Sequence, residues 1–418
     1  MDPVDAQYAA YPYPERDPAD EAKRLITGSP SHPVEIDHFL FGGRRDWGQP
    51  FRALIAGGGT GDAAIMLAQL TASAGVPAEV VYLDRSPASR RIAEARAAAR
   101  RLGNLRFETA DLADAPGFGP FDYIDCCGVL HHLERPEEGL AALVEALSPE
   151  GGMGLMVYAP HGRAGVYEMQ GLLRDLLEET ADPAERLAVA ESALADLPPT
   201  HPLARNPFVA DHKAGAAGVY DLLLSGRDRA YEIDAFLALI EGAGLRLAGF
   251  VEPARYDPDA YLRDPALKAR LAKASPAERA LFAERFAGNF KTHVLYVAPA
   301  ARGETRARPD KADAIPVLHS VERGALARSI AKTGRLRFSF DGLTIERAVD
   351  RGLSPLVERI DGRRSLSALQ AGSGLDWFQF QAAFGRLYAP LDGFNALRFS
   401  GFAAQGRERE RERERGRA

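Results

Sequence analysis

A run of glycines between two apolar stretches is the feature that most constrains how this chain folds. The run follows the apolar segment Arg52–Ala56, precedes a helical pattern over Asp62–Ala74, and reads Ala56-Gly57-Gly58-Gly59-Thr60-Gly61. Glycine lets the chain turn sharply and lets a ligand come close to the backbone. Free amide groups at the start of the helix favour an anionic ligand group. The run therefore predicts a strand, a tight turn and a helix that together bind a ligand.

Apolar strands and amphipathic helices alternate after this turn, which predicts an α/β fold with a doubly wound, mostly parallel sheet. We expect seven strands, one of them an antiparallel edge strand. The six that follow Arg52–Ala56 are Ala78–Leu83, Leu105–Thr109, Phe121–Cys127, Gly152–Tyr158, Leu245–Glu252 and Thr292–Ala298. Residues 161–232 interrupt the pattern with a largely helical insertion after the fifth strand. That position lies near the carboxyl ends of the strands, where open α/β sheets bind ligands.

The segments that flank the sheet predict further units. Residues 1–50 are rich in Tyr and Pro, and we interpret them as an arm or lid, or alternatively as an extension packed on the core. Residues 51–300 form the ligand-binding domain, and the charged segment 300–314 is a linker. We expect residues 315–402 to form a small α+β domain of winged-helix-like form. Residues 403–418 alternate Arg with Glu, and we expect a disordered tail.

Composition and charge exclude several classes of protein. Hydrophobic residues make up 46% and charged residues 26%, which is typical of globular chains. The net charge of −6 gives no support to a broad nucleic-acid-binding surface. The acidic start of the chain lacks the apolar segment of a secretory signal, so we expect a cytoplasmic protein without membrane association. Cys126 and Cys127 are adjacent, which suits neither a disulfide framework nor a metal site.

Acidic residues at two strand ends indicate an adenosine-containing ligand. Asp84 ends the second strand, where a carboxylate can accept hydrogen bonds from both ribose hydroxyls. Asp111 follows the third strand and can accept from an adenine amino group. Nicotinamide enzymes share the glycine turn and the first of these acids, so these residues leave the identity of the ligand open.

The run after the fourth strand adds a further motif, Val129-Leu130-His131-His132-Leu133. With it, the chain resembles the class I S-adenosylmethionine-dependent methyltransferases, on motifs that occur in the family's order at Gly57, Gly59, Gly61, Asp84, Asp111 and His132. The resemblance covers residues 50–300. It implies a seven-stranded Rossmann-like fold, S-adenosylmethionine as cofactor, and transfer of a methyl group to an unidentified acceptor. We favour a small molecule or a protein over RNA as this acceptor.

The resemblance also implies a set of cofactor-binding residues. A second resemblance lies in the flanks and rests on Tyr8, Tyr13 and the Tyr220–Leu224 run. There the chain is similar to bacterial methyltransferase domains related to those fused to tetratricopeptide arrays. This resemblance suggests that the two tyrosines belong to a lid. One position departs from the family pattern: Ile55 stands where the family often has an acid that helps hold the cofactor's amino end. The implied cofactor-binding residues are Tyr8, Tyr13, Ala56, Gly57, Gly58, Gly59, Gly61, Asp84, Arg85, Asp111, Leu112, Cys127 and Gly128.

The candidates for catalysis are His132, His161, Asp211 and His212. Each has a plainer interpretation: His132 as a residue that shapes the pocket, His161 as a loop residue, and the Asp211–His212 pair as part of a polar loop. Two other functions share some of the motifs. One is a nicotinamide-dependent oxidoreductase, and the other is a non-catalytic cofactor-binding regulator whose C-terminal domain contacts another macromolecule.

Overall fold

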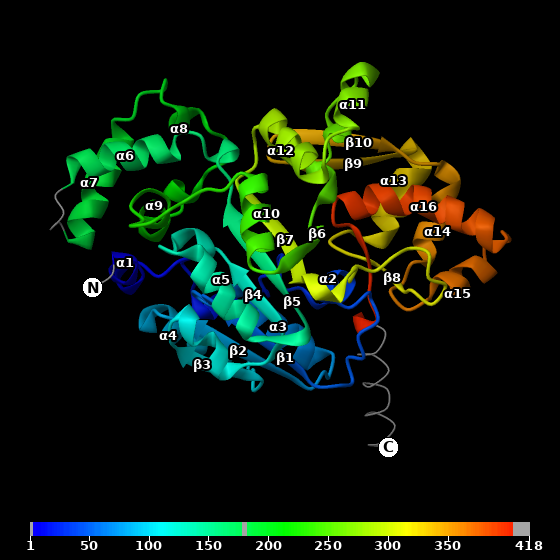
Figure 1. Ribbon diagram of the computed structural model, residues 1–418, viewed down its shortest axis with the longest axis horizontal. Coiled ribbons are helices and arrows are strands. Elements are labelled where there is room, and N and C mark those ends of the chain that lie inside the picture. The colour runs from blue at the N-terminus through cyan, green and yellow to red at the C-terminus, as the bar shows by residue number, and fades with distance from the viewer. Residues whose placement is uncertain (1–2, 178–181, 404–418) are drawn as a thin grey trace.

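The computed structural model describes residues 3–177 and 182–403, and the predicted charged tail lies outside these ranges except for its first residue. A seven-stranded sheet forms the centre of the larger unit (Figure 1). Its strand order is β3-β2-β1-β4-β5-β7-β6. The strands are β1 (Phe51–Ala56), β2 (Ala78–Asp84), β3 (Leu105–Thr109), β4 (Phe121–Cys127), β5 (Leu147–Tyr158), β6 (Leu245–Phe250) and β7 (Thr292–Pro299).

The topology confirms the predicted doubly wound sheet and corrects one detail. Strand β7 pairs antiparallel with both β5 and β6, so the antiparallel strand lies one place in from the edge and β6 is the edge strand. From β1 the chain adds β2 and β3 on one side, then crosses to add β4 and β5 on the other. Ligands bind open α/β sheets at such a switch point, beyond the carboxyl ends of the strands.

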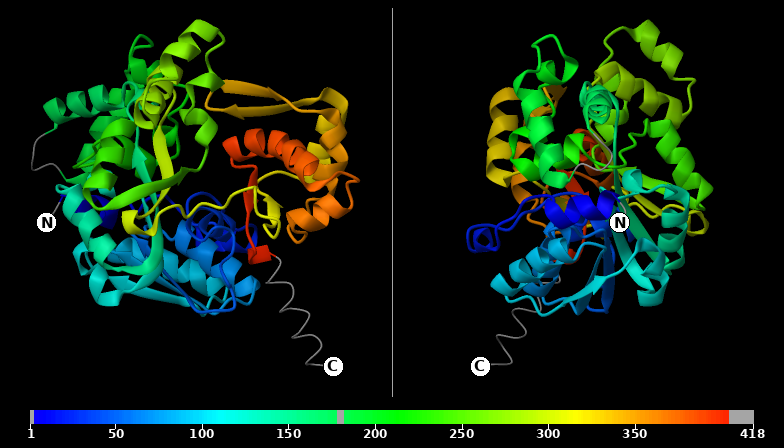
Figure 2. Two further views of the ribbon diagram at one scale, coloured as in Figure 1. Left: turned by 45° about the vertical axis from the view of Figure 1, so that its right-hand side comes forward. Right: turned by 90° about the vertical axis from the view of Figure 1, so that its left-hand side faces the viewer.

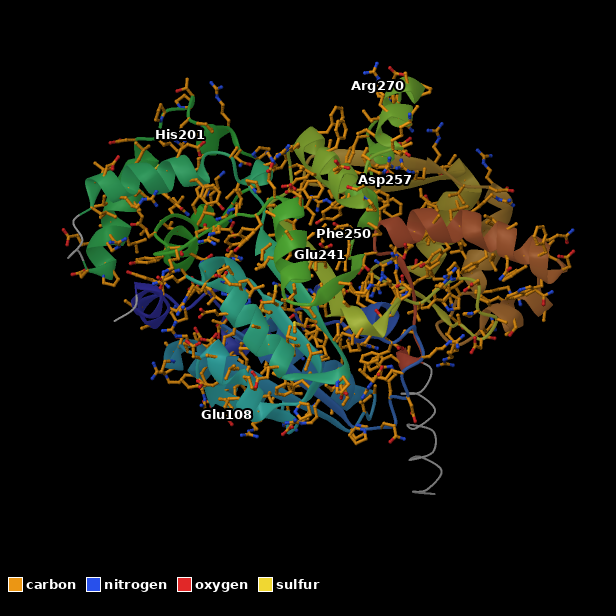
Figure 3. The ribbon with its side chains drawn as sticks, viewed as in Figure 1. Glu108, His201, Glu241, Phe250, Asp257 and Arg270 are labelled. Atoms are coloured by element: carbon orange, nitrogen blue, oxygen red, sulfur yellow. The ribbon has the colours of Figure 1, made fainter. Side chains whose placement is uncertain are left out.

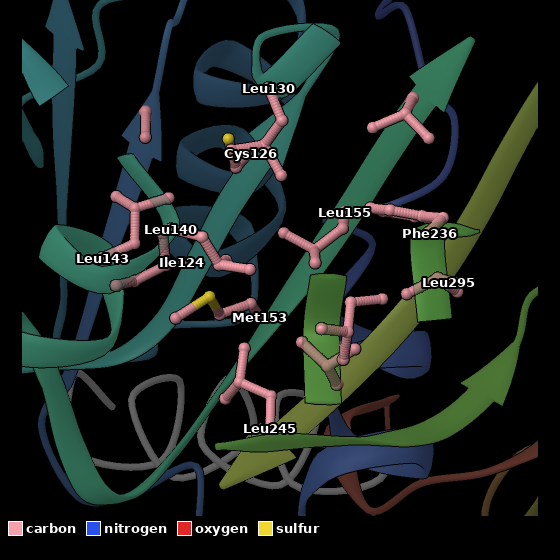
Figure 4. Close-up of a cluster of buried hydrophobic side chains, with 14 of the residues drawn as sticks. Ile124, Cys126, Leu130, Leu140, Leu143, Met153, Leu155, Phe236, Leu245 and Leu295 are labelled. Atoms are coloured by element: carbon pink, nitrogen blue, oxygen red, sulfur yellow. The ribbon is translucent and has the colours of Figure 1, made fainter. Parts of the chain in front are cut away.

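Alternation along the strands sends side chains into two apolar layers. On one face, α5 (Pro136–Glu145), α10 (Ile233–Gly242) and α12 (Pro276–Ala287) cover the sheet. Figure 4 shows this layer, in which Ile124 and Cys126 of β4 and Met153 and Leu155 of β5 face Leu140 and Phe236 from the helices. On the other face, α2 (Pro33–Leu40), α3 (Asp62–Ser73) and α4 (Pro87–Ala99) pack against the sheet. Burial on both faces explains why the strands are almost continuously apolar.

The insertion forms a helical cap beside the N-terminal arm, and the views in Figure 2 place it over the α1 end of the molecule. It contains α6 (Val166–Leu176), α7 (Pro183–Ala195), α8 (Pro202–Arg205) and α9 (Ala216–Leu223). The arm contributes α1 (Pro3–Ala10), whose neighbour Tyr11 stacks on Tyr220 of α9 with ring centroids 5.0 Å apart. The arm therefore packs on the insertion as well as on the sheet.

The C-terminal unit has its own apolar core and mixes helices with short strands. Its β9 and β10 pair as an antiparallel hairpin, while β8 pairs with β11. Helix α11 (Pro265–Leu271) projects from the neighbouring part of the larger unit, where exposed Arg270 is labelled in Figure 3. The elements of the C-terminal unit are β8 (Pro316–Leu318), α13 (Arg323–Thr333), β9 (Arg335–Phe340), β10 (Leu343–Ala348), α14 (Ser354–Arg359), α15 (Leu366–Ala371), α16 (Trp377–Gly393) and β11 (Leu397–Phe399).

Helix α2 lies between the sheet and the C-terminal unit, and every residue of it is buried (Figure 1). The predicted linker 300–314 is not a free linker, because it is hydrogen-bonded along this helix. Thr305 Oγ1 donates to the Phe39 carbonyl at 2.7 Å, and the Ala307 amide donates to the His38 carbonyl at 2.7 Å. None of the helices in the described residues has the length and apolar character that crossing a membrane requires.

Candidate functional site

A cavity of about 340 Å³ opens at the carboxyl ends of the central strands. Its walls come from the turn after β1, the ends of β2, β4 and β5, the arm, and α9 of the insertion. Among the residues that line it are Tyr8, Tyr13, Gly57, Gly58, Gly59, Gly61, Asp84, Arg85, Asp111, Leu112, Cys127, Gly128, His132, Tyr158 and Asp221. This set contains all the predicted cofactor-binding residues except Ala56, which is fully buried behind the turn.

The glycine turn is held by close packing. Gly57 has φ +74°, and a Cβ there would lie 2.2 Å from Cγ2 of Val129. Gly61 has φ +102°, and a Cβ there would lie 2.9 Å from Cβ of Ala93. Only glycine combines these left-handed conformations with so little room. The turn thus brings its backbone amides to the edge of the cavity.

Asp84 lies where the sequence predicts, at the end of β2 beside the turn. Its carboxylate accepts from the Gly59 amide at 2.7 Å and from the Ser86 amide at 2.8 Å. Asp111 follows β3, and its Oδ2 lies 3.4 Å from Nε of Arg85. Both carboxylates line the cavity on the β2–β3 side, so the predicted adenosine-binding acids share one wall.

The arm closes over the opposite side of the cavity through tyrosine hydroxyls. Tyr8 donates to Oδ1 of Asp221 at 3.0 Å, and Tyr158 donates to Oδ2 of the same carboxylate at 3.2 Å. Tyr13 donates to Asp211 at 3.0 Å. Burial raises the pKa of the Asp221 carboxyl above its usual value. Tyr8 and Tyr13 therefore line the cavity from the side of the arm.

Polar contacts also anchor the arm to the glycine turn. Thr60 donates through Oγ1 to the Pro14 carbonyl at 2.7 Å. Arg16 donates to both oxygens of Asp62, the first residue of α3, and its shortest contact is 2.6 Å. These contacts hold the chain of the arm directly beside the cavity.

The four predicted catalytic residues do not come together. His132 lines the cavity, with Nδ1 2.5 Å from the Arg227 carbonyl, and Asp211 lies behind Tyr13. His161 instead pairs with Glu232 at 2.9 Å on a partly exposed surface, and His212 lines a separate hollow in the insertion. The geometry therefore gives His161 and His212 no role at this cavity, because neither side chain reaches it.

Four charged residues of the cavity were not among the predicted site residues: Asp62, Asp125, Arg227, and Asp221 of the Tyr220–Leu224 run. Asp125 did carry a signal in the sequence, because it is a carboxylate in the buried middle of β4, between apolar Ile124 and Cys126. Asp62 and Arg227 carried none, since each is placed by contacts with distant segments.

The comparisons with known proteins agree with this geometry. Residues 54–153 match the family model of a methyltransferase domain. The chain contains a methyltransferase domain. Its fold, with seven strands and flanking helices, is that of the Rossmann-like methyltransferases. A relative from Synechococcus, described only as uncharacterized, is 32% identical over 264 residues, which cover 61% of this chain and 61% of the relative.

Solved structures extend the likeness in fold to most of the chain. PKMT2 from Rickettsia typhi, in complex with AdoHcy, has a TM-score of 0.60 at 14% identity and covers 88% of this chain and 75% of that one. A second structure of the same protein gives a TM-score of 0.61 at 15% identity, with 90% of this chain and 77% of that one covered. Since the match to the family model ends at residue 153, the shared fold includes segments beyond that match.

Proposed function

We propose that this chain is an S-adenosylmethionine-dependent methyltransferase whose cofactor lies in the cavity beyond β1, β2 and β4. The observation that supports this most directly is the wall formed by the glycine turn, Asp84 and Asp111. The match of residues 54–153 to a methyltransferase domain adds to it and does not favour a nicotinamide-dependent oxidoreductase. The complex of PKMT2 with AdoHcy supports the same cofactor pair, because AdoHcy is S-adenosylhomocysteine, the demethylated form of S-adenosylmethionine.

The residues present fit such a cofactor part by part. Asp84 suits the ribose hydroxyls, while Asp111 and the apolar side chain of Leu112 suit the adenine. The amides at the start of α3, where Asp62 and Ala63 line the cavity, suit the carboxylate of the amino-acid end. When bound, the cofactor supplies an electrophilic methyl group on a sulfonium. The chain's own tyrosines, Tyr8 and Tyr13, close the cavity from the arm side and exclude water from it.

Asp221 is the residue best placed to take a proton from an acceptor at the β5 end of the cavity. It is 3% exposed, and the hydroxyls of Tyr8 and Tyr158 orient its two oxygens. Its raised pKa makes it a better base than an ordinary surface aspartate. We expect the acceptor to be a small molecule or a protein, with the C-terminal unit free to contact a macromolecular partner.

Calorimetry with purified protein tests the proposal. We expect saturable one-site binding of both S-adenosylmethionine and AdoHcy, and no saturable binding of NADH. Saturable NADH binding without AdoHcy binding would reverse the assignment.

Gly59→Val tests the role of the turn. The residue has φ +50°, and its Cβ would lie 3.1 Å from the Tyr13 carbonyl, so a branched side chain disturbs both the turn and the arm. We expect AdoHcy affinity to fall by about 30-fold or more. Gly103→Ala is the matched control, because a Cβ there meets no atom within 4 Å. Normal affinity in a folded Gly59→Val protein would contradict the assignment of the turn.

A further inference from the structure

Asp125 is a buried carboxylate in the cavity wall with no cationic partner. It lies on β4, is 2% exposed, and lines the cavity. Its Oδ2 accepts from Oγ of Ser31 at 2.6 Å, and the Cys127 amide is its other hydrogen-bond donor. Within the described residues, no Lys, Arg or His comes within ion-pair distance of it. Burial of an unpaired carboxylate is costly, and burial raises the pKa of Asp125 to about 7.

Each of the other carboxylates of the cavity either has a hydrogen-bond or ion-pair partner in the protein or lies on another side of the cavity. Asp62 is bound by Arg16 and Arg96, and Asp84 by the amides of Gly59 and Ser86. Asp111 lies beside Arg85 at the half-exposed rim. Asp221 is held between two tyrosine hydroxyls on the side of the arm and the insertion. Asp125 is therefore the carboxylate of the cavity wall that best suits a cation supplied by a ligand.

The register of the sheet places Asp125 beside the start of the glycine turn. Asp125 on β4 pairs in parallel register with Ile55 on β1, two residues before Gly57. Ile55 lines the same cavity but is apolar, so β1 offers no charge there. An amino acid whose carboxylate lies against the amides at the start of α3, directly after the turn, has its ammonium group within a few ångströms of that carboxylate, and β4 is the strand adjacent to β1.

We propose that Asp125 receives the ammonium group at the amino-acid end of the cofactor. This inference rests on the proposed function, and it assigns to β4 the charge that β1 lacks at Ile55. The ligand chemistry is an α-amino acid group attached to an adenosine through sulfur. Ser31 then serves as a positioning residue, because its hydroxyl fixes Oδ2 of Asp125.

Three ligands measured on two proteins test the inference. The ligands are AdoHcy and an analogue in which hydrogen replaces the α-amino group, with 5′-methylthioadenosine as a ligand that lacks the amino-acid end. The proteins are the wild type and Asp125→Asn, which keeps an oxygen that can accept from Ser31. We expect Asp125→Asn to bind AdoHcy about 10- to 100-fold more weakly. We expect its affinity for the analogue and for 5′-methylthioadenosine to be unchanged.

The outcomes separate this inference from the function on which it rests. If the wild type binds none of the three ligands, the proposed function fails. If the wild type binds AdoHcy and Asp125→Asn binds it equally well, Asp125 does not hold the ammonium group and the inference is overturned. Equal losses for AdoHcy and 5′-methylthioadenosine also overturn it, because Asp125 would then act only on the shape of the cavity. Asp125→Ser is the second variant if Asp125→Asn does not fold.

Discussion

His32 shows how burial sets the charge of a single side chain at the junction between the sheet and the C-terminal unit. Its Nδ1 accepts from the Val34 amide at 3.2 Å and so caps α2. Its ring meets that of His319 edge to face, with centroids 4.5 Å apart. Burial, with the nearby His319, lowers the pKa of His32 to about 4. The imidazole is therefore neutral in the folded protein at pH values where the unfolded chain protonates it.

A histidine whose pKa is lower in the folded than in the unfolded protein makes its full contribution to the unfolding free energy above the pKa of the unfolded state. That contribution is lost as the pH falls toward the pKa of the folded state. For His32 the window runs from the ordinary value of about 6.5 down to about 4. We expect the wild type to lose on the order of 3 kcal/mol of unfolding free energy across this window through His32. His32→Asn keeps a side-chain acceptor for the cap but does not titrate.

Urea unfolding of both proteins at pH 7.5 and pH 4.5 measures this contribution. The excess stability of the wild type over His32→Asn should shrink as the pH falls, because the other titrating groups are common to both. A difference that stays constant between the two pH values would show that His32 titrates alike in the folded and unfolded states.

Residues of the site differ in how far the sequence alone reveals them. Gly57, Asp84 and Asp111 follow directly from strand ends and spacing, and the structure brings them to one cavity. Asp125 and Asp62 acquire their roles from Ser31 and Arg16, partners far away along the chain. Local pattern cannot supply such partners, because they depend on how the arm folds back over the sheet.

At the scale of elements, the short 3₁₀ helix η1 (Pro18–Ala22) ties the arm to α4. Its Glu21 lies 2.6 Å from Nε of Arg96, and both side chains are almost fully buried. The same helix carries Asp20, whose pair with Lys23 is exposed. Neighbouring residues of this short helix thus form a buried ion pair and an exposed ion pair, which can be compared directly.

Glu21→Gln should lower the unfolding free energy by about 3 kcal/mol, because it leaves the Arg96 guanidinium buried with only part of its charge balanced. Asp20→Asn is the control and should leave stability unchanged within error, since exposed pairs contribute little. Chemical denaturation of the three proteins at pH 7 provides the measurement. Equal effects of the two substitutions would contradict a special role for the buried pair.

The elements of the sheet were predictable, whereas parts of the insertion were not. Strands β3 and β4 begin and end where the apolar pattern does. Helix α9 lies in a stretch that reads as irregular, because Gly215 and Gly218 interrupt its pattern. Gly218 is required by packing, since a Cβ there would lie 2.0 Å from the Asp211 carbonyl oxygen. Tertiary contact thus overrides the weak local propensity of glycine.

At the scale of the whole molecule, α2 and Arg398 join the two units that the sequence suggests are separate. Arg398 is fully buried and donates to the Val251 carbonyl at 2.6 Å and to Asp392 at 2.5 Å. Asp37 of α2 accepts from Ser400 at 2.7 Å. Composition predicts a linker at 300–314 from its charge, but charge along a segment does not show whether its backbone is hydrogen-bonded. The interface is therefore a continuation of the core that hydrogen bonds cross.

This continuity predicts that the two units unfold together, and the two tryptophans can report on each. Trp47 packs against Phe51 beside the sheet, and Trp377 belongs to α16 of the C-terminal unit. In Trp377→Phe and in Trp47→Phe, the fluorescence of the remaining tryptophan should change at the same urea concentration as the far-ultraviolet circular dichroism of that protein.

Arg398→Met, added to each of these backgrounds, should lower the stability reported by both tryptophans by the same amount, about 3 kcal/mol, because it leaves the Asp392 carboxylate without one of its buried partners. Because Arg398 also contacts the larger unit through the Val251 carbonyl, equal losses at both tryptophans, and not merely some loss at Trp47, indicate one shared transition. If Trp377 instead reports unfolding at lower urea while Trp47 is unaffected, the interface does not couple the units, and the C-terminal unit is an independent domain after all.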